Sequence, residues 1–147
     1  MIQLSSGWEK HSSAMINHVG KRPLKAKIIL IVEDDQNLLK ALQDTLLREG
    51  FLVLVAPNGD EGFKMALAQK PNLILLDIVM PVMDGVAMLK KLREDAWGKT
   101  VPVFMLTNLN ESISISDTMN QKITRYLIKS DWSLHDIVGE IKLTLHI

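Results

Sequence analysis

Residues that could do chemistry follow several apolar runs of this sequence. Glu33, Asp34 and Asp35 follow the first run, and later runs end at Asp77, Thr107 and Lys129. Converging carboxylates repel one another unless a cation lies between them, and their hard oxygens favour Mg²⁺ or Mn²⁺. A metal, a carboxylate, a hydroxyl and a lysine are together the groups that phosphoryl transfer requires.

Each of these residues also has an ordinary structural explanation. Asp34 or Asp35 could cap a helix, Thr107 could be a capping hydroxyl, and Lys129 could be a surface lysine. The chemical interpretation therefore depends on all of them meeting at one place. Ligands of open parallel sheets bind at the carboxyl ends of the strands, which is where these residues are expected.

Five apolar runs supply the strands of such a sheet. They cover residues 28–32, 51–56, 73–76, 101–106 and 125–128, and helical patterns separate them. Strands that alternate with helices predict an α/β fold in three layers, with a doubly wound parallel sheet covered on both faces.

Helix boundaries are marked by capping residues. Gly50 is expected to end the first helix, and Asn58 to cap the second. Asp84 precedes the third, and Ser133 with Asp136 resembles a capping box before the last. The segment 111–121 alternates polar and apolar residues like a strand, but the rhythm of the fold requires a helix there. We predict a weak helix.

Composition is that of one ordinary domain. The chain has 147 residues, of which 47% are hydrophobic, with no net charge and no cysteine. Nothing global argues for nucleic-acid binding, and neither a disulfide nor a thiolate metal site is available. Apolar runs are too short for a membrane span. We expect a flexible extension over residues 1–26, a folded domain over residues 27–147, and a cytoplasmic location.

Four motifs in order resemble the receiver domain of two-component response regulators. They are Ile-Leu-Ile-Val-Glu33-Asp34-Asp35, Leu-Leu-Asp77-Ile-Val-Met-Pro-Val-Met-Asp84-Gly85, Leu106-Thr107 and Tyr126-Leu-Ile-Lys129. The resemblance spans residues 27–147. It implies the flavodoxin-like receiver fold, a five-stranded parallel sheet in the order 2-1-3-4-5.

The resemblance also implies a role for each matching residue. Asp77 corresponds to the phosphorylation site. Glu33 and Asp34 correspond to the acid pair that holds Mg²⁺ (or Mn²⁺) beside it, with the backbone carbonyl of Val79 as a further ligand.

The switch residues are assigned in the same way. Thr107 corresponds to the switch hydroxyl, Lys129 to the lysine that pairs with the phosphoryl group, and Tyr126 to the aromatic switch. Val79 and Leu109 match positions that flank the path of a hydrolytic water. Because both are apolar here, slow loss of the phosphoryl group is expected.

The sequence departs from the family pattern in three places. Asn108 follows Thr107 where a small residue is usual, and residues 130–132 replace the commoner proline after Lys129. Lys122 takes the place of a frequent glycine. If Lys122 adopts a positive φ it carries a strain of roughly 1 kcal/mol, unless Asn120 takes that role.

These features predict a phosphorylated signalling switch and not an enzyme that turns over an external substrate. A sensor histidine kinase or a histidine phosphotransfer protein would supply the phosphoryl group, and a downstream protein or a homodimer would receive the signal. The chain could be a stand-alone receiver or a fragment without its output domain. The alternatives are an unphosphorylated interaction module and a metal-dependent phosphatase, although Val79 replaces the second aspartate that such phosphatases need.

Overall fold

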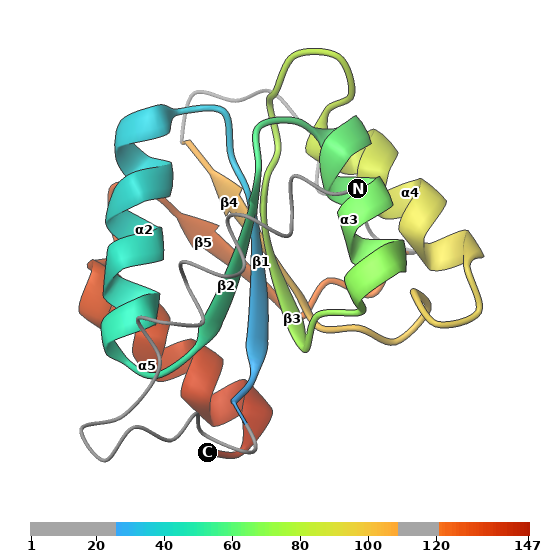
Figure 1. Ribbon diagram of the computed structural model, residues 1–147. Coiled ribbons are helices and arrows are strands. Elements are labelled where there is room, and N and C mark those ends of the chain that lie inside the picture. The colour runs from blue at the N-terminus through green and yellow to red at the C-terminus, as the bar shows by residue number, and fades with distance from the viewer. Residues whose placement is uncertain (1–25, 109–120) are drawn as a thin grey trace.

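The computed structural model describes residues 26–108 and 121–147. In this part of the chain five strands form one parallel sheet in the order β2-β1-β3-β4-β5, which confirms the predicted order. The strands are β1 (Ile28–Val32), β2 (Leu52–Ala56), β3 (Leu73–Asp77), β4 (Val103–Thr107) and β5 (Arg125–Ile128). The helices between and after them are α2 (Gln36–Arg48), α3 (Gly59–Gln69), α4 (Gly85–Glu94) and α5 (Leu134–Leu145) (Figure 1).

The sheet is the middle of three layers. Alternate residues of each strand point to opposite faces, so β1 to β4 contribute to two cores, whereas β5 contributes Leu127 to one of them. Helices α2 and α5 cover one face and α3 and α4 cover the other (Figure 1). The central strands are apolar on both faces, as expected for a buried parallel sheet.

The two cores differ in composition. Leucine, isoleucine, valine and phenylalanine fill the α2/α5 side. All five methionines of the described residues lie on the α3/α4 side, with three of them buried (Met80, Met88 and Met105) and two partly buried (Met65 and Met83). Methionine is flexible and fills irregular gaps, so the α3/α4 side has the softer packing.

The predicted caps are present. Asp35 Oδ1 accepts hydrogen bonds from the backbone N–H groups at the start of α2, so Asp35 and not Asp34 caps this helix. Asn58 and Asp84 cap α3 and α4 in the same way. Ser133 and Asp136 form the reciprocal capping box of α5. Each cap satisfies helix N–H groups that would otherwise lack a partner.

Two strands begin later than the apolar runs suggest. The runs 51–56 and 101–106 become strands at Leu52 and Val103. Phe51 is buried, but its N–H donates to the carbonyl of Leu46 at 3.1 Å and so belongs to the end of α2. Gly50, with φ of 94°, provides the left-handed turn between them.

The described residues do not cover every segment for which the sequence makes a prediction. The predicted helix over 111–121 and the extension over 1–26 lie almost entirely outside the described residues. Trp97 packs against the α3/α4 core and Trp132 against the α2/α5 core. No helix in the described ranges has the length and apolar character to cross a membrane.

Candidate functional site

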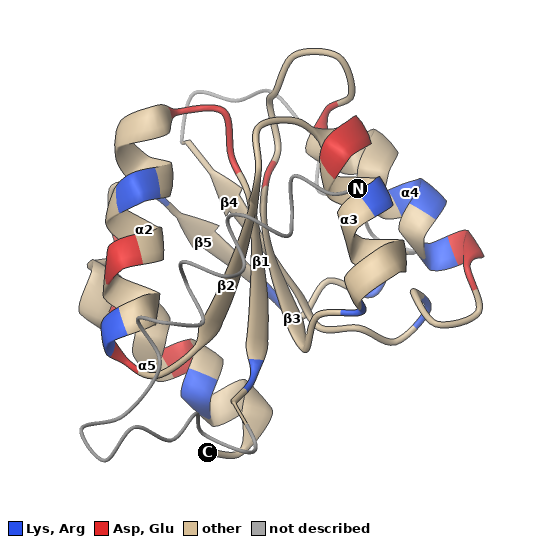
Figure 2. Cartoon of the chain, viewed as in Figure 1, with Lys and Arg blue, Asp and Glu red and all other residues tan. Residues whose placement is uncertain are grey.

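Acidic residues gather where β1 and β3 end. β1 and β3 are neighbours in the sheet, so Glu33 and Asp77 emerge side by side. Figure 2 shows this concentration of acidic residues at one end of the sheet. Glu33 is 0% exposed and Asp77 is 2% exposed, whereas Asp34 is exposed. Two fully buried carboxylates require a compensating charge.

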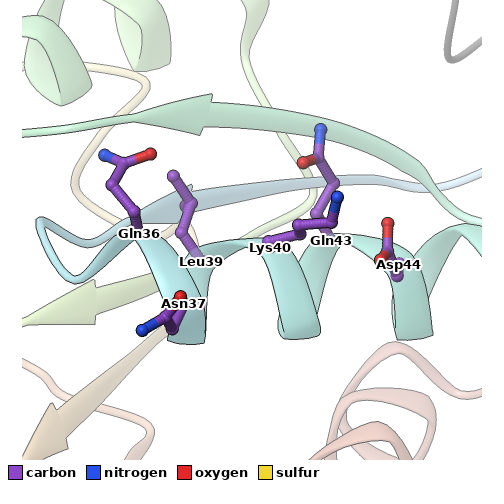
Figure 3. Close-up of a pocket in the computed structure, with 6 residues that line it drawn as sticks. All are labelled: Gln36, Asn37, Leu39, Lys40, Gln43 and Asp44. Atoms are coloured by element: carbon purple, nitrogen blue, oxygen red, sulfur yellow. The ribbon is translucent and has the colours of Figure 1, made fainter.

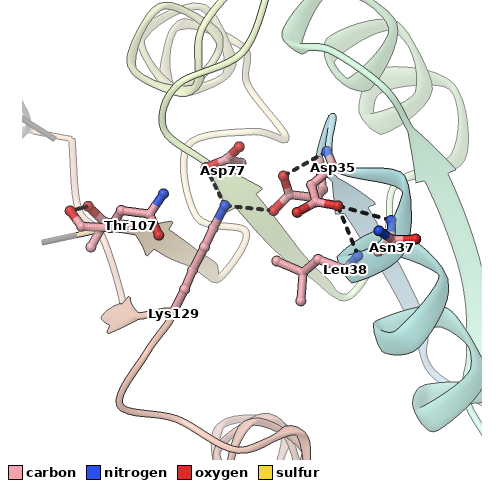
Figure 4. Close-up of polar contacts among 8 residues, drawn as sticks. Asp35, Asn37, Leu38, Asp77, Thr107 and Lys129 are labelled. Atoms are coloured by element: carbon pink, nitrogen blue, oxygen red, sulfur yellow. Dashed lines mark hydrogen bonds and ion pairs between the residues drawn. The ribbon is translucent and has the colours of Figure 1, made fainter. Parts of the chain in front are cut away.

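Lys129 supplies that charge. Its Nζ lies 3.0 Å from Glu33 Oε1 and 3.1 Å from Asp77 Oδ1 (Figure 4). The lysine is fixed at its backbone as well, because its N–H donates to the carbonyl of Thr107 at 2.8 Å. Residues from the ends of three strands therefore meet around one ammonium group.

The carboxylates are nevertheless under-satisfied. Glu33 Oε1 and Asp77 Oδ1 are buried and accept no well-directed hydrogen bond, although both contact the ammonium of Lys129. Burial, followed by the neighbouring Glu33 carboxylate, raises the pKa of Asp77 to about 8, and Lys129 only partly opposes this. Burial works against the charged form of Lys129, but Glu33 and Asp77 outweigh it and raise the lysine pKa.

The same atoms fit a divalent metal ion. Glu33, Asp34 and Asp77 each offer one carboxylate oxygen, and these oxygens lie within 4.8 Å of one another. An all-oxygen donor set with two under-satisfied buried carboxylates suits a hard cation such as Mg²⁺.

The remaining predicted residues surround this centre. The Thr107 hydroxyl donates to the carbonyl of Asn108 at 3.1 Å, and the line drawn from it in Figure 4 runs there and not towards Asp77. Val79, two residues after Asp77, is 51% exposed. Tyr126 lies on edge strand β5 and is 39% exposed. The structure thus brings together the acids and the lysine, with Thr107 on the adjoining strand end.

Two glycines shape the loop after Asp77, and the sequence patterns did not reveal their close backbone contacts. A Cβ on Gly85 would lie 2.1 Å from the backbone oxygen of Asp77, and one on Gly59 would lie 2.4 Å from that of Met83. Gly85 N–H also donates to Ile78 O at 2.7 Å. The Asp-Gly pair at 84–85 predicts a helix start, and in the structure Gly85 also lets α4 pack against the backbone of Asp77.

The structure shows the conformation of Lys122 and the exposure of Asn108, two of the residues that depart from the family pattern. Lys122 has φ of 54°, so it takes the left-handed conformation that was one of the two options considered. Asn108 is exposed. Val82 in the loop after β3 also has a positive φ, 70°, which the sequence did not indicate.

A separate groove lies along α2. Its volume is about 360 Å³, and all six lining residues belong to that helix (Figure 3): Gln36, Asn37, Leu39, Lys40, Gln43 and Asp44. These side chains include one lysine, one aspartate and three amides, and all of them come from a single helix. The groove therefore does not bring reactive groups together from different elements.

Comparison with known proteins agrees with this geometry. A family model described as the response regulator receiver domain matches residues 29–142. The chain is 39% identical over 85 residues to the alkaline phosphatase synthesis transcriptional regulatory protein PhoP of Bacillus subtilis, a match that covers 58% of this chain and 35% of PhoP. It is 33% identical over 117 residues to the transcriptional regulatory protein SrrA of Staphylococcus aureus, covering 80% of this chain and 47% of SrrA. The matches therefore span less than half of either relative.

A solved structure extends the comparison to the fold. A CheY-like response regulator receiver domain protein from Methanospirillum hungatei superposes with a TM-score of 0.74 at 28% identity. The superposition covers 83% of this chain and 95% of the other.

Proposed function

Because this chain belongs to the response regulator receiver family, we propose that it is a switch phosphorylated on Asp77. Receiver domains of transcriptional regulators are signalling switches. The observation that carries the proposal is the contact of Lys129 with both Asp77 and Glu33 in a buried site. A lysine with a purely structural role usually pairs with one acid at the surface. Lys129 instead contacts two buried acids that come from different strands.

In the proposed reaction a carboxylate oxygen of Asp77 attacks the phosphorus of the donor. A new P–O bond forms, and the bond from phosphorus to the donor atom breaks, with its electron pair leaving on the donor. The donor would be the phosphohistidine of a sensor histidine kinase or of a histidine phosphotransfer protein. Lys129 would pair with the negative oxygens of the phosphoryl group, and the Thr107 hydroxyl would donate a hydrogen bond to one of them.

The metal would be held by the carboxylates of Glu33, Asp34 and Asp77 and by the carbonyl of Val79. When bound, Mg²⁺ or Mn²⁺ supplies positive charge that offsets the phosphoryl oxygens. Asp77 must lose its proton before it can bind the metal or attack phosphorus, so its raised pKa makes both steps favour higher pH.

Signal output would follow from the new hydrogen bond of Thr107. Drawing the hydroxyl towards the phosphoryl group would change the end of β4 and the surroundings of Tyr126 on β5. A downstream protein or a second copy would detect that surface. We propose a cytoplasmic location, no turnover of an external substrate, and no direct nucleic-acid or membrane binding by this segment.

Intact mass measurement tests this function. The protein is incubated with Mg²⁺ and acetyl phosphate, and one phosphoryl group is expected to be added. Asp77→Asn should add none, and Asp44→Asn, which removes an aspartate from α2 outside the site, should behave like the wild type. Labelling of Asp77→Asn at the wild-type level would refute the assignment.

A further inference from the structure

Arg93 on α4 binds four backbone carbonyls. Its Nε donates to Gln121 O at 2.7 Å and its Nη2 to Lys122 O at 2.8 Å. Its Nη1 donates to Gly98 O at 2.7 Å and Val101 O at 2.8 Å. One side chain therefore joins α4 to the loop before β4 and to the segment before β5.

Carbonyl dipoles take the place of a counter-ion here. Arg93 is partly buried, and no ion pair connects it to a carboxylate within the described ranges. Burial lowers the pKa of the guanidinium. A planar guanidinium presents five N–H donors in a fixed fork, so a lysine could not reproduce this set of bonds.

The segment that Arg93 holds leads directly into β5. Lys122 has a left-handed backbone, and Thr124 N–H then donates to Val103 O at 3.0 Å. β5 has four residues and lies at the edge of the sheet, paired with β4 alone. A short edge strand has few bonds of its own to keep it in place, so the attachment at its start matters.

The far end of the same strand carries Lys129. The residue follows directly after β5, and its ammonium reaches Glu33 and Asp77. We propose that Arg93 is a positioning residue for phosphoryl acceptance: it anchors the start of β5 and thereby holds Lys129 against the acceptor. This proposal rests on the proposed function, because it concerns the same reaction.

The first test uses amide hydrogen exchange on full-length wild type and Arg93→Met, which keeps much of the aliphatic stem but has no donors. Exchange in β5 should accelerate at least tenfold while exchange in β1 changes little. Arg93→Lys, which retains the charge, should accelerate β5 to an intermediate degree. Equal acceleration of both strands in these variants would overturn the proposal. This readout needs no phosphorylation, so it stands even if the proposed function fails.

The second test separates Lys129 from the metal ligands. With acetyl phosphate and saturating Mg²⁺, the rate of phosphorylation should fall roughly tenfold in Arg93→Met, because a small misplacement of a reacting group is costly. Mg²⁺ affinity should stay within twofold, since the carboxylates proposed to hold the metal lie at the ends of β1 and β3 and not on β5. A wild-type rate in Arg93→Met would contradict the proposal, as would an equal loss of Mg²⁺ affinity. Absence of phosphorylation in the wild type would refute the proposed function instead.

Two controls exclude a general loss of stability. Leu52→Ala removes a buried side chain from β2, the opposite edge strand, and should leave the phosphorylation rate unchanged at temperatures where the protein is folded. Adding Arg93→Met to Lys129→Ala should slow phosphorylation by less than twofold, because the residue through which Arg93 acts is already gone. A full additional loss in the double variant would show that Arg93 acts by another route.

Discussion

Lys129 Nζ lies 3.1 Å from Asp77 Oδ1, although β3, which ends at Asp77, and β5, which precedes Lys129, are not neighbours in the sheet. β4 separates β3 from β5, so the lysine side chain has to pass the end of β4, where Thr107 lies. Any group bound between Asp77 and Lys129 is therefore beside the Thr107 strand end.

The affinity for Mg²⁺ should depend on pH through Asp77. Its pKa in the metal-free protein is about 8, against a reference value of 3.8, because of burial and Glu33. A proton therefore competes with the metal below about pH 8. Apparent affinity should rise with pH by up to about tenfold per unit until the pKa is reached, and then level off. Isothermal titration calorimetry from pH 6 to pH 9 measures this, and Asp77→Asn should flatten the dependence.

Stability without metal should change in the opposite direction. The folded protein holds the Asp77 proton more tightly than the unfolded chain does. Its contribution is fully present below the unfolded pKa of about 3.8 and is lost as pH rises through the folded pKa of about 8. Urea unfolding in the presence of a chelator should therefore show a steeper decline between pH 5 and pH 8 in the wild type than in Asp77→Asn. Parallel curves would mean that the Asp77 proton is not linked to folding.

The adjacent acids Asp34 and Asp35 should behave differently. Asp34→Ala removes a metal ligand and should abolish most of the rise in melting temperature that Mg²⁺ produces. Asp35→Ala removes the α2 cap, so it should cost about 1 kcal/mol of stability but keep the Mg²⁺-dependent rise. Thermal unfolding with and without Mg²⁺ compares the two. An equal Mg²⁺ response in wild type and Asp34→Ala would remove Asp34 from the ligand set.

Val82 should be replaceable with a gain in stability. It has φ of 70° and is 83% exposed, so a β-branched side chain is strained there while burying almost nothing. Val82→Asn should raise the free energy of unfolding by about 1 kcal/mol, because asparagine tolerates the left-handed region. Val79→Asn changes the same residue types at an exposed position without a positive φ, and should give no such gain in denaturant unfolding.

Loss of the phosphoryl group should be slow in the wild type and faster when Val79 becomes polar. Val79 cannot hold a water molecule for attack on phosphorus, and its half-exposed side chain stands two residues from Asp77. Val79→Asn combined with Leu109→Glu should shorten the lifetime of the phosphorylated protein several-fold, as intact mass over time would show. Leu109 lies outside the described residues. Val82→Asn serves as the control, and decay that is equal or slower in the double variant would argue against this role.

Much of the fold follows from the sequence because burial dominates it. Strands β1 to β4 match continuous apolar runs to within two residues at each end, and each capping residue is of a type that favours that position. The acids and Lys129 could be placed for a simple reason, since parallel strands bring their carboxyl ends to one edge. The sequence left open which of Asp34 and Asp35 caps α2, because either adjacent acid can accept the helix N–H groups, and the structure identifies Asp35.

Other features leave no pattern in residue types. The four partners of Arg93 are backbone carbonyls, which every residue has, so the sequence around Gly98 or Gln121 carries no trace of the contact. The left-handed conformation of Val82 could not be predicted from the sequence either. Glycine and asparagine are the residues that usually indicate this conformation, and position 82 has neither. The contact of Gly85 with the Asp77 backbone depends on how α4 packs, a tertiary relationship that a local motif does not specify.

The confinement of the described methionines to one side of the sheet makes them selective reporters. Methyl groups of isotopically labelled methionine give sharp NMR signals, and here Met65, Met80, Met83, Met88 and Met105 all sample the layer between the sheet and α3/α4. The signals of these five methionines would follow rearrangements on that side and would report little about the α2/α5 side. A rearrangement that involves Met80 and Met83, in the loop after Asp77, could therefore be distinguished from one that involves α5.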